Sequence, residues 1–331
     1  MSIDWEKKIR IDPEWTNRQL VNHFLNKKLK LTVRGYTPKT SGTNFNCDDL
    51  IEELGFFIPD YVHSEKSKQK KLKALKSKFG DKLADLRLDT ALYQEAQTFF
   101  GKKDPSTDGK YGELLLFALT ESILKSKMVA HKIVGLSNSK DQVKGGDGIF
   151  LGNYEIENGK FEPAIFIGES KIMQGFSDCI GDALESIDRF HAPETKAEFN
   201  SMEFIVANNT MFIDDKDVEY DKIYDLLTPG TEAYKKQILV HPVLIMYNTK
   251  SIEKLEIKAK NNDELEDLIK KYMLGKENEF INKINEKVKD FPNIQKVYID
   301  FFCFPFNNID NFRNGMYFNI HKVPFKVDAV K

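Results

Sequence analysis

Residues 145–171 read GGDGIFLGNYEIENGKFEPAIFIGESK, and this stretch decides the fold class. It holds two apolar runs, 149–151 and 164–167, with Asn158-Gly159 between them. An Asn-Gly pair between two apolar runs is the strongest short signal for a β-hairpin. The sequence therefore predicts two antiparallel strands joined by a tight turn.

Helices and further strands are predicted on both sides of this hairpin. Residues 113–124 are strong helix formers and almost all apolar, which indicates a helix buried against a sheet. Apolar residues recur at helical spacing over 176–190, whereas 238–247 and 297–304 are rich in Phe, Ile and Val, as buried strands are. We therefore expect an α/β fold in which a mixed central sheet is flanked by helices.

Two charged stretches predict additional helices. Residues 66–82 carry eight lysines and place apolar residues at helical spacing, so we expect an amphipathic basic helix. A solvated surface is its simplest interpretation, and a contact with phosphate or with an acidic partner is the alternative. Residues 262–291 form a charged helical region in which Gly275 is expected to cause a break.

Turn-forming residues between 101 and 112 mark the clearest boundary in the chain. We predict an N-terminal helical and basic region over 1–105 and a core over 106–250 that contains the hairpin. A C-terminal α/β extension over 251–331 is expected to pack on this core.

The overall charge, the cysteines and His241 each give no positive indication of a nucleic-acid, zinc or catalytic site. Lys and Arg number 49 against 51 Asp and Glu, a net charge of -2, so overall charge does not indicate nucleic-acid binding. Cys47, Cys179 and Cys303 show no zinc-site spacing and are expected to be reduced core thiols. His241, beside Pro242 in an apolar run, is expected to be a hydrogen-bonded core histidine.

Walker A, G-x-G-x-x-G and G-x-S-x-G motifs are absent, so we expect no nucleotide to be bound by this chain. No apolar stretch approaches the length of a membrane span, and no membrane contact is expected. We therefore expect a cytoplasmic protein.

Asp147, Glu169 and Lys171 are the residues from which chemistry is expected. Side chains at i and i+2 of a strand share one face, so Glu169 and Lys171 should project together, while Ser170 turns away and leaves its carbonyl at the strand edge. An acid from the neighbouring strand would complete the set of oxygen ligands that Mg²⁺ prefers. A bound metal and a lysine are suited to phosphodiester hydrolysis. An ion pair at an exposed strand end is the alternative.

The pairing register decides whether Asp147 joins this site. A strict two-residue turn at Asn158-Gly159 puts Gly148 opposite Glu169 and turns Asp147 to the wrong face. Glycines tolerate the dihedral angles of a bulge. We therefore predict a bulge or a strand end within 145–148 that turns Asp147 toward Glu169.

Three segments, 111–115, 145–148 and 168–171, resemble the PD-(D/E)xK nuclease superfamily, in its Cap4-like form, in their order and spacing. More narrowly, the chain resembles the HamA family of Hachiman antiphage defence systems, most clearly over 85–250. The superfamily's motif has a proline where this chain has Gly146. The expected fold is thus a restriction-endonuclease-like core with N- and C-terminal elaborations.

The resemblance implies roles for individual residues. Asp147 and Glu169 would bind divalent metal, together with the Ser170 carbonyl at the strand edge. Lys171 would be the catalytic lysine, and Glu113 an auxiliary acid near the metal.

The resemblance also implies an activity and a partner. The expected protein is a Mg²⁺-dependent deoxyribonuclease, with Mn²⁺ as a substitute, that acts as the effector subunit of a bacterial defence complex. Its partner would be a HamB-like superfamily 2 helicase subunit in a heterodimer, and cleavage would begin once the helicase engages target DNA. Two alternatives are a catalytically silent adaptor of a helicase and a stand-alone restriction-type endonuclease.

Overall fold

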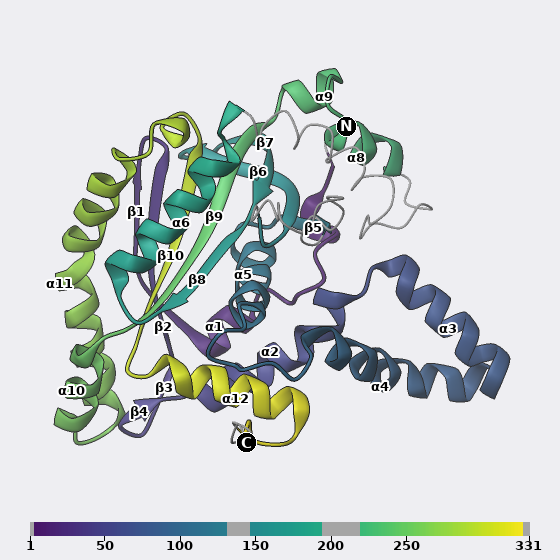
Figure 1. The fold of residues 1–331 in the computed structure, drawn as a ribbon, viewed down its shortest axis with the longest axis horizontal. Helices are drawn as coiled ribbons and strands as arrows, with labels where there is room; N and C mark the ends of the chain where they lie inside the picture. The colour runs from purple at the N-terminus through teal and green to yellow at the C-terminus, as the bar shows by residue number, and fades with distance from the viewer. Residues whose placement is uncertain (1–2, 131–145, 194–218, 327–331) are drawn as a thin grey trace, which may run out of the picture.

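The computed structural model describes residues 3–130, 146–193 and 219–326, and within them eight strands form one central sheet (Figure 1). Its order is β1-β2-β10-β9-β7-β6-β5, and β8 follows β7 along the same edge of β9. The strands are β1 (Leu20–Lys28), β2 (Leu31–Pro38), β5 (Lys127–Ala130), β6 (Ile149–Glu157), β7 (Lys160–Ile167), β8 (Glu169–Met173), β9 (Ile238–Asn248) and β10 (Tyr298–Phe306). A separate small sheet pairs β3 (Thr40–Ser41) with β4 (Asn44–Phe45).

The central sheet is mixed, as predicted. β9 runs parallel to β10, β7 and β8, and β10 runs parallel to β2. The β1–β2, β5–β6 and β6–β7 pairs are antiparallel, and the last of these is the predicted hairpin. The expected α/β class with a mixed central sheet is confirmed.

Helices cover both faces of this sheet (Figure 1). One apolar cluster joins the sheet to α2 (Cys47–Val62), α5 (Lys110–Ile123) and α12 (Ile309–His321). A second joins it to α6 (Phe176–Phe190), α10 (Lys250–Lys258) and α11 (Asn262–Val288). The remaining described helices are α1 (Trp15–Gln19), α3 (Glu65–Phe79), α4 (Asp81–Phe100), α8 (Tyr220–Leu227) and α9 (Glu232–Lys235), with short 3-10 turns at Trp5–Lys7 and Pro292–Ile294.

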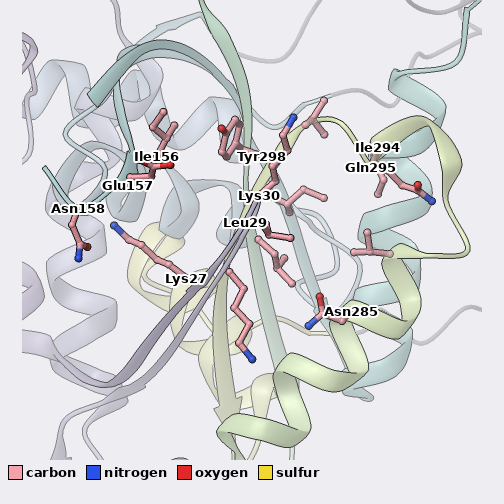
Figure 2. A pocket seen from close by; sticks show the side chains of 15 residues that line it. Lys27, Leu29, Lys30, Ile156, Glu157, Asn158, Asn285, Ile294, Gln295 and Tyr298 are labelled. Carbon is pink, nitrogen blue, oxygen red and sulfur yellow. The ribbon is translucent and has the colours of Figure 1, made fainter. Parts of the chain in front are cut away.

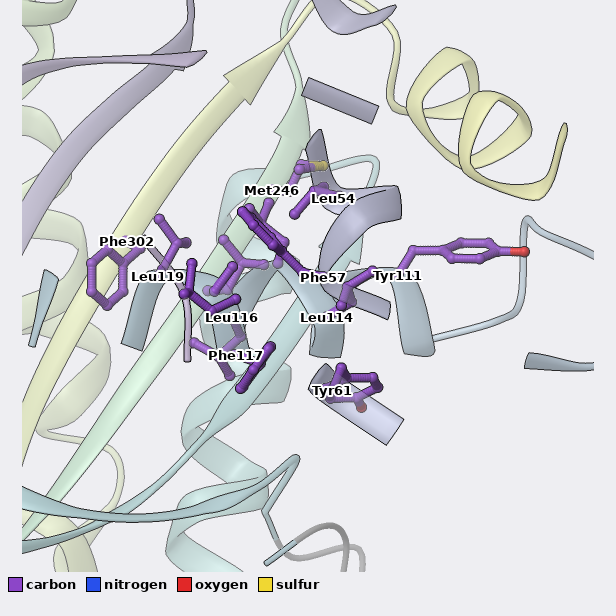
Figure 3. Packing of buried hydrophobic residues seen from close by; sticks show 14 of the residues in the cluster. Leu54, Phe57, Tyr61, Tyr111, Leu114, Leu116, Phe117, Leu119, Met246 and Phe302 are labelled. Carbon is purple, nitrogen blue, oxygen red and sulfur yellow. The ribbon is translucent and has the colours of Figure 1, made fainter. Parts of the chain in front are cut away.

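Helix α5 is buried almost all round, which explains its nearly continuous apolar sequence. Leu114, Leu116 and Phe117 pack between the sheet and α2, where Phe57 and Tyr61 face them (Figure 3). Burying a side chain of this size contributes about 1.5–3 kcal/mol. The helix predicted over 113–124 is therefore confirmed, and its polar residues are held in a largely apolar layer.

Two sequence-based expectations about helices are wrong. Gly275 does not break α11, which is continuous from Asn262 to Val288. An isolated glycine costs a helix about 1 kcal/mol, which the burial of side chains such as Ile269 and Phe280 outweighs. The basic stretch 66–82 is not one helix, because Gly80, with φ +78°, ends α3 and precedes α4.

The first 105 residues contribute more than helices. β1 and β2 lie in the central sheet, so the sheet draws strands from all three predicted segments. The boundaries at 105 and 250 stay a prediction. Among the described residues, no helix combines the length and the apolar character needed to cross a membrane.

The cysteines are free thiols, as predicted. Cys179 and Cys303 are buried, and Cys47 is half-buried. Burial raises the pKa of Cys179 and of Cys47 to about 12, so both stay protonated and unreactive.

Candidate active site

The candidate site begins where β6 leaves the edge of β7. The ladder shifts register between Glu155 and Glu157, next to the turn, so that Ile149 pairs with Ile167. The Gly168 amide then donates to the Gly148 carbonyl at 3.0 Å, and the Asp147 amide donates to the Gly168 carbonyl at 2.7 Å. Two residues of one strand therefore oppose one of the other, which is a bulge.

This bulge lies within the predicted glycine segment, although Gly145 falls outside the described residues. Gly146 has φ +76°, a conformation that side chains rarely adopt, and a Cβ there would come within 2.7 Å of Ile167. The second irregularity, near Glu155, was not expected. It means that Gly148 pairs with Gly168 rather than lying opposite Glu169.

Asp147 caps the edge of β8 that faces away from β9. Its Oδ2 accepts hydrogen bonds from the Ser170 amide and from the Ser170 hydroxyl, both at 2.6 Å. The Asp147 amide also donates a hydrogen bond to the Gly168 carbonyl. These contacts fix Asp147 to the main chain on both sides of Glu169. Because the amide and carbonyl of one strand residue point to the same edge, the Ser170 carbonyl also lies on the Asp147 side.

Glu169 and Lys171 project together, as their i, i+2 spacing predicts. Lys171 Nζ lies 3.0 Å from Glu169 Oε1, and the side chains are 26% and 9% exposed. Their register partners on β9, Val243 and Ile245, belong to the apolar cluster beneath α6. The pair therefore lies on the α6 face of the sheet, whereas Ser170 faces α5.

Glu113 lies in the first turn of α5 and is buried. Its Oε2 accepts a hydrogen bond of 3.0 Å from the hydroxyl of Tyr61 on α2. Burial raises the pKa of Tyr61 well above its usual value, and the charges of Glu113 and Asp147 raise it further. Tyr61 is therefore a neutral donor in the same neighbourhood as both carboxylates.

Two glycines allow α5 to approach β8 closely. A Cβ on Gly112 would lie 3.2 Å from Ile172 and from the Ser170 hydroxyl. A Cβ on Gly168 would lie 2.9 Å from Leu116 Cδ2. This close packing brings the first turn of α5, and with it Glu113, to the capped edge of β8.

Tyr61 and Arg313 belong to this site, although sequence reasoning did not identify either. Arg313 Nη2, from α12, donates to the Ile172 carbonyl at 2.8 Å, one step further along the edge that Asp147 caps. Tyr61 is 52 residues from Glu113, and Arg313 is 141 from Ile172. No local sequence pattern signals contacts across such separations.

The fit of a metal is partial. Within 3–130, 146–193 and 219–326, no three His, Cys, Asp or Glu side chains are grouped so that they could hold an ion. Asp147 is bonded to Ser170, Glu169 to Lys171 and Glu113 to Tyr61. Mg²⁺, however, is usually bound by one or two carboxylates and keeps several waters. Asp147, Glu169 and the Ser170 carbonyl supply oxygen donors of that kind, and their assignment as ligands stays a prediction.

A large hollow elsewhere does not belong to this site. A cavity of about 1030 Å³ lies between the β1–β2 turn, the β6–β7 turn and the start of β10, lined by residues such as Lys27, Leu29 and Tyr298 (Figure 2). Asn158, in its lining, marks the end of β6 remote from Asp147.

Two comparisons with known proteins bear on the whole chain. A protein-family model described as HamA matches residues 11–320. A search of curated proteins found no match. The family match includes every residue of the candidate site.

Proposed function

This chain belongs to the HamA family, and thereby to Hachiman antiphage defence. From that premise we propose that it is a metal-dependent DNA nuclease that works with a helicase subunit. The observation that carries the proposal is the bonding of Asp147 to the main chain on both sides of Glu169. Asp147 is thereby held against the segment of β8 that carries Glu169, Ser170 and Lys171, which supports the proposal that these residues act together.

Asp147, Glu169 and the Ser170 carbonyl would hold a divalent cation, Mg²⁺ or Mn²⁺, with Glu113 as an acid nearby. When bound, the cation would neutralise charge on a phosphate and lower the pKa of a bound water. Oxygen donors of this kind suit hard cations and do not suit softer metals that prefer thiolates or imidazoles.

The chain's own residues would then position and stabilise the reacting groups. Hydrolysis adds one water across a phosphodiester: the water oxygen bonds to phosphorus, a P–O bond to the sugar breaks, and the leaving oxygen takes up a proton. Lys171 Nζ would offset the negative charge that develops on the phosphate oxygens. Glu169, 3.0 Å away, holds that ammonium group, and Tyr61 holds Glu113.

The test replaces Glu169 by Gln and, separately, Lys171 by Met in the full chain assembled with its helicase. We expect DNA degradation to fall by about 100-fold or more in each variant, because Lys171→Met removes the positive charge that stabilises the transition state and Glu169→Gln removes the carboxylate that would hold the cation and Lys171. Glu162→Gln is the matched control, since Glu162 also faces a lysine, Lys160, at 3.9 Å, but is more exposed.

Three outcomes separate this proposal from its alternatives. Loss of cleavage in both site variants, with the control intact, supports the nuclease. Undiminished degradation and phage protection in Glu169→Gln would favour a catalytically silent adaptor. Efficient, metal-dependent cleavage by the isolated wild-type chain would favour a stand-alone endonuclease.

A further inference from the structure

Helices α3 and α4 form a hairpin that projects from the body of the molecule as an arm (Figure 1). We propose that the outward face of α3 binds the sugar-phosphate backbone of DNA and guides it toward the edge of β8. This inference rests on the proposed nuclease function and names the surface that would hold its substrate.

The two helices of the arm differ sharply in charge. From Glu65 to Phe79, α3 carries seven lysines against one glutamate, whereas α4 carries four acidic and two basic residues. The net charge of -2 for the whole chain therefore conceals a strongly basic helix. Clustered positive charge of this kind is the electrostatic footprint of a polyanion-binding surface.

The lysines of α3 are arranged as a stripe. Lys66, Lys70 and Lys73 are exposed and follow one another at spacings of four and three, so they share one face of the helix. Leu72 and Leu75 occupy the opposite face, and Leu75 is buried. The stripe spans about 10 Å, over which one DNA strand presents about three phosphates.

Ion pairing leaves two lysines of the stripe available. Lys68 pairs with Asp60, and Lys71 pairs with Glu95 of α4, both on the side of α3 turned away from the stripe. No ion pair involves Lys70 or Lys73 within the part of the chain that the structure describes. The ammonium groups of these two residues can therefore contact phosphates without first breaking an ion pair.

The base of the arm is fixed beside the candidate site. Arg10 Nη1 donates to the carbonyls of Asp60 and His63 at 2.8 and 2.7 Å, and His63 Nε2 lies 2.9 Å from the Leu92 carbonyl. Tyr61, which bonds Glu113, lies five positions before Lys66. DNA lying along the stripe would thus reach the carboxylates at its inner end.

The composition of this face favours nucleic acid over a protein partner. Protein interfaces are depleted in lysine and centre on buried apolar side chains. The face that carries the stripe adds only small or polar residues, Gln69, Ala74 and Ser77. The large exposed apolar residues of the arm, Leu83, Leu86 and Phe99, belong to α4.

The test compares two triple variants, each in a Glu169→Gln background so that the DNA stays intact. The first is Lys66→Gln, Lys70→Gln and Lys73→Gln. The matched control changes Lys254, Lys258 and Lys260 to Gln, at exposed positions in or next to α10. Binding of the full chain to a fluorescent duplex of about 30 base pairs is measured between about 50 and 200 mM salt.

We expect the arm variant to bind about tenfold more weakly or worse. The slope of log K against log salt should become shallower by about 1.8 to 2.7, or 0.9 for each lost phosphate contact of two or three lysines. The control should match the parent in affinity and slope. Far-ultraviolet circular dichroism checks that all variants are equally helical.

An unchanged slope in the arm variant would overturn the proposal. The proposal also fails if the variant keeps its DNA affinity but no longer co-purifies with the helicase, because the stripe would then be a protein-docking surface. A separate cleavage assay of the wild-type chain, which has Glu169, distinguishes the nuclease proposal from the proposal that α3 binds DNA. If it shows no cleavage while the arm variant still loses DNA binding, the nuclease function fails and the arm assignment stands.

Discussion

His241 should make the protein less stable in mild acid, and one substitution should remove that effect. The side chain lies on β9 and is 1% exposed. Its Nδ1 lies 3.0 Å from the Ile167 carbonyl, and its Nε2 lies 2.8 Å from Nε2 of His191. Because a carbonyl only accepts, Nδ1 carries the proton, and Nε2 must accept from His191. A second proton on His241 would place its Nε2–H group against the Nε2–H group of His191, and His191 would have to change its tautomer or turn away.

The magnitude follows from the pKa of His241. Burial, with a smaller contribution from His191, lowers this pKa to about 3, against 6.5 for the unperturbed side chain. The folded state therefore binds fewer protons than the unfolded state between these values. The contribution of neutral His241 to the free energy of unfolding is fully present above pH 6.5 and is lost as pH falls toward 3. At about pH 5 the loss from His241 alone is about 2 kcal/mol.

The assay is urea unfolding of the wild type and of His241→Asn at about pH 7.5 and about pH 5. Asparagine can keep an N–H group near the Ile167 carbonyl but does not titrate. Any constant cost of the substitution cancels, because each protein is compared with itself at two pH values. We expect the acid-induced loss to be smaller by about 2 kcal/mol in the variant. Equal losses in the two proteins would refute the reasoning.

Three further substitutions test the packing and the site. Asp300→Ala should lower the free energy of unfolding by about 3–5 kcal/mol, because Asp300 is fully buried and pairs with Arg34 through two bonds of 2.8 and 2.9 Å; a loss below about 1 kcal/mol in urea unfolding would contradict this. Gly168→Ala should cost about 1–3 kcal/mol in the same assay, since its Cβ would lie 2.9 Å from Leu116, and adding Leu116→Ala should cost less than the sum of the single changes. Tyr61→Phe should cost about 1.5–3 kcal/mol through loss of the bond to a buried carboxylate and should slow DNA cleavage by the assembled complex; unchanged stability would show that the bond contributes little.

The parts of the fold that the sequence could predict are those with a local signal. The hairpin around Asn158-Gly159 and the joint projection of Glu169 and Lys171 depend on turn chemistry and on the alternation of a strand, both of which act over a few residues. The contact of Tyr61 with Glu113 has no such signal, because it depends on how two helices pack.

Two other differences between expectation and structure also arise from packing between segments that lie far apart in the sequence. The continuity of α11 through Gly275 depends on burial that a helix-breaker rule does not count. The placement of β2, and of β1 beside it, in the central sheet depends on a parallel pairing of β2 with β10, between segments more than 260 residues apart, such as Phe301 with Val33. Pairings across such distances are set by the whole fold rather than by either segment.

The capped edge of β8 has a consequence for solubility. A strand with one unpaired edge is a template for pairing with another chain, and proteins guard such edges with charged side chains. Asp147 and Arg313 form hydrogen bonds with the Ser170 amide and the Ile172 carbonyl on this edge. Another chain therefore cannot pair with these two main-chain groups, whether or not Asp147 and Arg313 have a catalytic role. Asp147→Ala would expose the Ser170 amide and invite self-association. The main chain of Glu169 faces β9, so the Glu169 side chain does not cover this edge. A substitution of Glu169 is therefore less prone to cause self-association than one of Asp147.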